Sequence, residues 1–121
     1  MKKFNLETGK IGEEIAKEYL KKKGFKILEQ NYKTKYGEID LVCQDKKTLV
    51  IVEVRTKKGE NFGTPEQSLD KKKLRKLWFN AQSYTARKKI KTPCRIDAVC
   101  IVLSPTKHKV PERIGYYENI I

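Results

Sequence analysis

The chain has 121 residues, and 28 Lys and Arg against 15 Asp and Glu give it a formal net charge of +13. This length is enough to bury a core without disulfides, so we expect a single domain over residues 1–121. The excess of cations indicates a polyanionic partner. No apolar run is long enough to span a bilayer, and no apolar segment follows the N-terminal lysines, so we expect a cytoplasmic protein without a membrane partner.

The number and spacing of the cysteines and the histidine argue against disulfides, a zinc site and a histidine-based catalytic triad. Cys43, Cys94 and Cys100 are odd in number and lack C-x-x-C spacing, which predicts reduced, buried thiols rather than disulfides or zinc ligands. The single histidine, His108, lies in a stretch flanked by prolines. A His-based catalytic triad is therefore not expected.

The first half of the chain predicts one helix and three strands. Apolar residues recur at helical spacing from Thr8, a candidate N-cap, to Lys23, and Gly24 is a C-terminal stop. Three segments rich in apolar and β-branched residues then predict strands. They cover residues 25–32, 38–44 and 49–56. The last two are separated by four polar residues, as in a hairpin, and are expected to be central.

The second half predicts a long helix and at least one more strand. Thr64 and Pro65 are typical of a helix start, although Asp70 could cap a second start, and the helix is expected to reach Lys89. Its apolar residues, Trp78 among them, are predicted to share one side. Residues 96–103 predict a strand, and residues 114–121 a last strand or a short helix. The class is α/β, with a mixed central sheet flanked by helices in the order α-β-β-β-α-β.

Two carboxylates interrupt the predicted central hairpin. Glu53 stands within an otherwise apolar strand, and Asp40 lies between Ile39 and Leu41 of the neighbouring strand. A buried carboxylate needs a cation or hydrogen bonds, and hairpin partners on one face lie about 5 Å apart. The two acids could therefore hold one divalent cation through oxygen ligands. An ion pair of either acid with Arg55 or Arg95 is the alternative.

Further polar residues surround this pair in the predicted fold. Glu13, in the first helix, could add a third oxygen ligand or could be a solvated surface acid. Strand periodicity places Arg55 and Lys57 on the side of Glu53, where a cation could hold a phosphate or position a water. Asp97, in the strand over residues 96–103, could be structural or functional.

A cationic block lies between Lys71 and Arg95, with ten basic residues and no acidic one. It predicts contact with a phosphate backbone, and a solvated helix face is the alternative. The aromatic residues Tyr32, Tyr36 and Phe62 flank turns or loops and could stack on unpaired bases, but edge packing is the better interpretation.

Four short motifs together resemble the YraN family. They are Gly12-Glu13-x-x-Ala16, Gly37-Glu38-Ile39-Asp40-Leu41-Val42, Val52-Glu53-Val54-Arg55 and Arg95-Ile96-Asp97. The resemblance implies a restriction-endonuclease-like fold, similar to that of Holliday-junction resolvases and other D…(D/E)-x-K phosphodiesterases. It implies Mg²⁺ or Mn²⁺ bound by Glu13, Asp40 and Glu53.

The same resemblance implies roles for the cations. Arg55 stands where the phosphodiesterase motif has its catalytic lysine, and we expect Lys57, further along the same strand, to share that role. Arginine is a poor general base but can clamp phosphate. The expected nucleic-acid contacts are Gln67, Lys71, Lys72, Lys73, Arg75 and Lys76. For Gln67 and Lys73, a helix cap and a solvated lysine are the alternatives.

The expected function is a metal-dependent DNA endonuclease that acts on branched or single-stranded DNA by attack of water on a phosphodiester. One alternative is a DNA- or RNA-binding protein of the same fold without cleavage. A second alternative is a basic structural protein associated with RNA or the ribosome. Related resolvases dimerise, so the resemblance also allows a homodimer, although nothing in the sequence identifies an interface.

Overall fold

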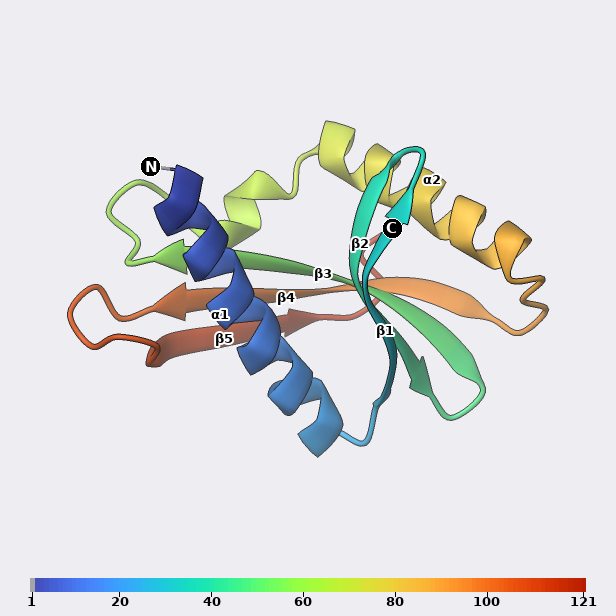
Figure 1. Ribbon diagram of the computed structural model, residues 1–121, viewed down its shortest axis with the longest axis horizontal. Helices are drawn as coiled ribbons and strands as arrows, with labels where there is room; N and C mark the ends of the chain where they lie inside the picture. Colours follow the sequence, from blue (N-terminus) through green and yellow to red (C-terminus); the bar gives the residue numbers. More distant parts are fainter. Residues whose placement is uncertain (1) are drawn as a thin grey trace.

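A five-stranded sheet forms the centre of the molecule, with one long helix against each of its faces (Figure 1). The computed structural model describes residues 2–121, with side chains from Leu6 onward. The helices are α1 (Lys2–Lys22) and α2 (Lys71–Arg87), and a short 3-10 helix, η1 (Pro65–Ser68), precedes α2. The strands are β1 (Lys26–Thr34), β2 (Gly37–Asp45), β3 (Thr48–Lys58), β4 (Cys94–Leu103) and β5 (Pro111–Tyr117).

The sheet is mixed and has the strand order β1-β2-β3-β4-β5. Three neighbouring pairs are antiparallel, and β3 and β4 are parallel. Parallel neighbours need a crossover, which here contains η1 and α2. The predicted order α-β-β-β-α-β fits this architecture. The last strand, β5, begins at Pro111 and ends at Tyr117, so it starts before the predicted segment 114–121 and leaves its last four residues outside the sheet.

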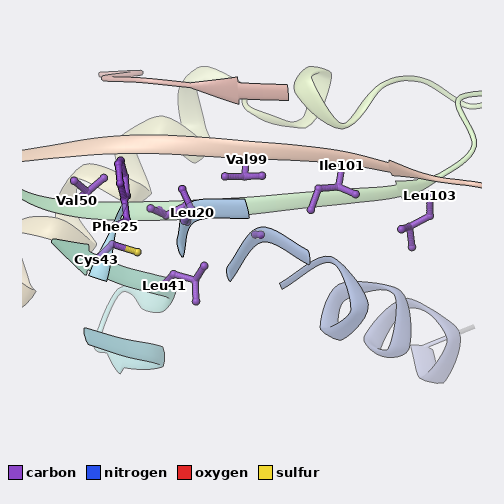
Figure 2. Close-up of a cluster of buried hydrophobic side chains, with 10 residues drawn as sticks. Leu20, Phe25, Leu41, Cys43, Val50, Val99, Ile101 and Leu103 are labelled. Atoms are coloured by element: carbon purple, nitrogen blue, oxygen red, sulfur yellow. The ribbon is translucent and has the colours of Figure 1, made fainter. Parts of the chain in front are cut away.

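Alternate residues of the central strands bury against different helices. Val50 and Val52 of β3 pack with Ala16 and Leu20 of α1, in the cluster drawn in Figure 2. Their neighbours on β3, Leu49 and Ile51, belong to a second cluster. Residues of α2 complete that cluster: Leu77, Ala81 and Tyr84. Side chains two residues apart share a face of a strand, so α1 and α2 cover opposite faces.

The helix boundaries differ from the prediction at both helices. Helix α1 begins at Lys2, so Thr8 is not its cap. The helix expected from Thr64 to Lys89 is two helices, because both candidate caps are used. Thr64 closes a capping box on η1, and the Asp70 carboxylate accepts a hydrogen bond from the Lys73 NH at 2.8 Å to begin α2.

Two residues expected in the core are exposed. Trp78 is 44% exposed, because its neighbour Leu77 faces the sheet and adjacent helical residues point about 100° apart. Cys94 is exposed at the first position of β4, whereas Cys43 and Cys100 are buried as expected. In the part of the chain that the structure describes, no helix is both long and apolar enough to cross a membrane.

Candidate functional site

The site forms where β2 and β3 separate. Their ladder runs from Asp45 and Thr48 to Leu41 and Val52. Beyond that pair, the Val54 NH donates a 2.7 Å hydrogen bond to Oδ2 of Asp40. The Asp40 carboxylate thus takes the place of a strand carbonyl and lies at the gap between the two strands.

Asp40 and Glu53 are in direct contact, as the hairpin register predicted. Burial, the charge of Glu53, a side-chain hydrogen bond to Glu53 and the charge of Glu13 all raise the pKa of Asp40, while the Val54 NH lowers it. The result is a pKa of about 8. Two carboxyl groups that share one site cannot both ionise easily, so this pair retains a proton near neutral pH.

Two cations contact the Glu53 carboxylate, which is only 3% exposed. Nζ of Lys73 lies 3.1 Å from Oε2 of Glu53, and Nη1 of Arg55 lies 3.3 Å from the same oxygen. The ion pair with Arg55 that we considered as an alternative is therefore present, together with the contact to Asp40. A buried carboxylate is stabilised by such pairing.

Ser68 of η1 fixes the orientation of Arg55. Nε of Arg55 donates a 2.7 Å hydrogen bond to Oγ of Ser68, which in turn donates to the Pro65 carbonyl at 2.6 Å. The guanidinium is thus held between Glu53 and η1. The hydrogen bond between Ser68 and Arg55 was not predicted, because nothing in the sequence indicates that η1 packs against β3.

Glu13 lies near the pair without joining it. Nδ2 of Asn31 donates a 2.9 Å hydrogen bond to Oε1 of Glu13. Glu13, Arg55 and Lys57 line one cleft of about 460 Å³. Among side chains from Leu6 to the C-terminus, no three His, Cys, Asp or Glu residues form a group that could hold a metal ion. The structure therefore brings together Asp40 and Glu53, with Glu13 as a nearby charge.

The six expected nucleic-acid contacts fall into three groups. Four lie on α2 with exposed side chains: Lys71, Lys72, Arg75 and Lys76. Gln67 closes the capping box of η1, and its Oε1 accepts a 2.8 Å hydrogen bond from the Thr64 NH. Lys73 is turned toward Glu53 and is not a freely solvated lysine.

Asp97 belongs to a hydrogen-bond network separate from Asp40 and Glu53. This agrees with the structural role, one of the two roles that the sequence left open for it. It is fully buried and accepts hydrogen bonds from Nε of Arg95, the Tyr116 hydroxyl and the Asn119 NH. These contacts join β4 to β5 and to the C-terminal segment. Asp97 makes no contact with Asp40 or Glu53 among its described partners.

A family model described as "Uncharacterised protein family UPF0102" matches residues 12–101. The chain belongs to the UPF0102 family. YraN is a name of this family, so the resemblance of the motifs is confirmed at the level of the family. The chain is 46% identical over 121 residues to a UPF0102 protein of Caldanaerobacter subterraneus subsp. tengcongensis, with 98% of each chain covered.

Two further UPF0102 proteins are similar over most of their length. The one from Persephonella marina is 45% identical over 100 residues, which is 82% of this chain and 86% of the relative. The one from Thermotoga petrophila is 43% identical over 111 residues, which is 92% of this chain and 94% of the relative.

The acid pair of this UPF0102 protein has the donor chemistry that Mg²⁺ or Mn²⁺ requires. Both metal ions prefer carboxylate oxygens, and Asp40 and Glu53 present such oxygens in contact with each other. Because a bound cation requires ionised ligands, it would displace the proton that Asp40 retains.

Proposed function

We propose that this chain is a metal-dependent endonuclease of the restriction-endonuclease-like fold, acting on DNA. The observation that carries the proposal is the contact between Asp40 and Glu53 at the gap between β2 and β3, with Lys73 and Arg55 on Glu53. Adjacent acids and cations are the groups that phosphodiester hydrolysis uses.

Each residue of the site has a role in the proposed reaction. Asp40 and Glu53 would hold Mg²⁺ or Mn²⁺, and a metal ion bound there would lower the pKa of a water and polarise the scissile phosphate. Arg55, oriented by Ser68, is placed to bind a phosphate oxygen. Lys73 would add a second positive charge near the phosphoryl oxygens, on which negative charge develops. Lys57 and the exposed lysines of α2 would hold the flanking backbone.

The direct test is cleavage of labelled DNA with added Mg²⁺ or Mn²⁺. Single-stranded, branched and duplex oligonucleotides are compared for the unmodified protein, Asp40→Asn and Glu53→Gln. We expect both substitutions and excess EDTA to abolish cleavage. Glu14→Gln is the matched control, because Glu14 is an exposed acid of α1 that pairs only with Lys17 among the described residues. Cleavage that persists in both acid variants would rule out the proposal.

A DNA- or RNA-binding protein without cleavage is the second candidate. It is favoured by Arg55, which stands where the motif has lysine, and by the two cations that already neutralise Glu53. This candidate predicts retention of nucleic acid by the unmodified protein without turnover in Mg²⁺ or Mn²⁺. It also predicts that Asp40→Asn leaves the affinity unchanged.

A further inference from the structure

Three exposed aromatic rings form a continuous cluster on α2 and the β1–β2 turn. Tyr36, Phe79 and Trp78 are 37%, 39% and 44% exposed. The rings of Tyr36 and Phe79 are stacked, with centroids 5.3 Å apart and an angle of 28° between their planes. Trp78 meets Phe79 edge to face, with centroids 5.2 Å apart. Contiguous exposed apolar surface of this kind marks an interaction site.

A shallow groove of about 530 Å³ lies beside the stacked pair. The residues that line it come from the turn and from the outer face of α2: Lys35, Tyr36, Phe79, Gln82, Ser83, Ala86 and Arg87. The turn is fixed against α2, because Oγ1 of Thr34 donates a 2.5 Å hydrogen bond to Oδ1 of Asn80. This hydrogen bond holds the turn beside the outer face of α2, next to the groove.

The charge around the groove is positive. Nζ of Lys35 lies 5.2 Å from the centre of the Tyr36 ring, and Arg87 lines the groove on the side of α2. Among the side chains from Leu6 onward, no acidic residue lines the groove, and α2 contains six basic residues and no acidic one. A ligand that matches both features has flat aromatic groups and negative charges.

Unpaired nucleotides have this chemistry. Bases of any sequence stack on aromatic side chains, and the phosphates between them pair with lysine and arginine. A second copy of the chain matches less well, because a symmetric contact would bring the cations of both copies together. A membrane surface also matches less well, because Gln82 and Ser83 interrupt the apolar lining that an interfacial helix needs.

We propose that this groove binds an unpaired nucleotide of the DNA strand whose backbone reaches the acid pair. The inference rests on the proposed function and specifies single-stranded or branched substrates. Two elements join the groove to the site. Phe79 lies six residues after Lys73 on α2, about 9 Å along the helix axis at 1.5 Å per residue. Tyr36 lies in the turn just before β2, four residues before Asp40, which is at most about 13 Å of chain at 3.3 Å per residue.

Binding is measured without divalent metal, so that no cleavage is needed. Fluorescence anisotropy of labelled oligo(dT) and of a duplex of equal length gives the two affinities in EDTA. Phe79→Leu removes the ring but keeps an apolar side chain, and Tyr36→Leu does the same on the turn. We expect each to weaken oligo(dT) binding at least about fivefold and duplex binding much less. Far-UV circular dichroism checks that the variants are folded.

Leu28→Ala is the matched control, since Leu28 is also 39% exposed but lies near the start of β1, away from the turn. It should leave both affinities unchanged. Trp78 is the only tryptophan of the chain, so its fluorescence reports on the cluster directly. We expect oligo(dT) to quench this fluorescence and vesicles of phosphatidylglycerol to leave it unchanged.

Several outcomes would overturn the inference. They are unchanged oligo(dT) affinity in both ring variants, equal losses for oligo(dT) and duplex, and quenching by vesicles but not by oligo(dT). Other outcomes distinguish a failure of the proposed nuclease function from a failure of the proposed groove. Selective binding of oligo(dT) without any metal-dependent cleavage would refute the nuclease alone. Metal-dependent cleavage with unchanged oligo(dT) affinity in both ring variants would refute the groove alone.

Discussion

Lys73 of α2 and Glu53 of β3 form an ion pair with a distance of 3.1 Å between Nζ and Oε2. The pair depends on the break between η1 and α2, because Asp70 caps α2 and thereby places Lys73 in its first turn. Lys73 thus places a lysine beside Asp40 and Glu53. In the D…(D/E)-x-K motif the lysine comes from the strand, and this chain has Arg55 at that position. A cation on α2 can supply the charge that Arg55 supplies from β3.

In the proposed nuclease reaction, removal of Lys73 should therefore slow cleavage. We expect Lys73→Ala to reduce the single-turnover rate in Mn²⁺ about hundredfold or more, as loss of one charge-stabilising group typically does. Lys22→Ala is the control, because Lys22 is an exposed lysine at the last position of α1. Equal rates for the two variants would show that the ion pair is not used in the reaction.

Lys57 and Arg55 can be separated by the same measurement. Both line the cleft, but only Arg55 has a described ion pair with the acids, and Ser68 orients it. We expect Arg55→Ala to lower the rate more than Lys57→Ala does. If Lys57→Ala cleaves as fast as the unmodified protein, the sharing of the catalytic role that the sequence indicated is wrong.

Asp40 should make the protein less stable as the pH rises. Its pKa is 3.8 when unperturbed and about 8 in the folded chain, so between these values the folded state holds a proton that the unfolded state has lost. The free energy of unfolding then falls with pH, by up to about 1.4 kcal/mol per pH unit for one proton. Urea denaturation at several pH values in EDTA measures the slope.

The control for this slope is Asp40→Asn, which cannot titrate. We expect it to remove most of the decrease between pH 4.5 and 7.5, whereas Glu14→Gln, a substitution of an exposed acid, should retain it. The same pH dependence in Asp40→Asn and the unmodified protein would show that another group is responsible.

The acid pair could be predicted from the sequence because it depends on local register. A short polar turn between two apolar segments fixes which residues of a hairpin face each other, and Asp40 and Glu53 follow from that register. The positions of Lys73 and Ser68 could not be predicted. They depend on how the crossover packs on the sheet, which no periodicity within a single element reveals.

Glu13 and Trp78 illustrate a second limit of the sequence. Helical spacing places Glu13 near β3, but its hydrogen bond to Asn31 depends on an irregular β1, where Asn31 has a φ of 52°. For Trp78, apolar character suggested burial, yet the sheet accommodates only the face that carries Leu77 and Ala81. Composition could not distinguish a core ring from one of an exposed cluster.

Glu66 should make the protein sensitive to acid. Hydrogen bonds from Arg113, at 2.5 and 2.9 Å, and from Tyr117 lower its pKa from 4.5 to about 2. The stabilising contribution of the ionised group is present above pH 4.5 and is lost as the pH falls toward 2. Glu66→Gln should therefore show a smaller loss of thermal stability between pH 4.5 and 2.5 than the unmodified protein. An identical loss in both would contradict this assignment.

Helix α1 offers two glycines with opposite expectations for substitution by alanine. A Cβ at Gly12 would lie 1.8 Å from Oγ1 of Thr56 on β3, whereas a Cβ at Gly9 would have no neighbour within 4 Å. Gly12→Ala must push the helix from the strand next to the acid pair, and we expect it to lower the free energy of unfolding by about 1–3 kcal/mol. Gly9→Ala adds a better helix former on an open face and should raise it by up to about 1 kcal/mol. Chemical denaturation of both variants measures the difference, and effects of the same sign would contradict the close packing of α1 on Thr56.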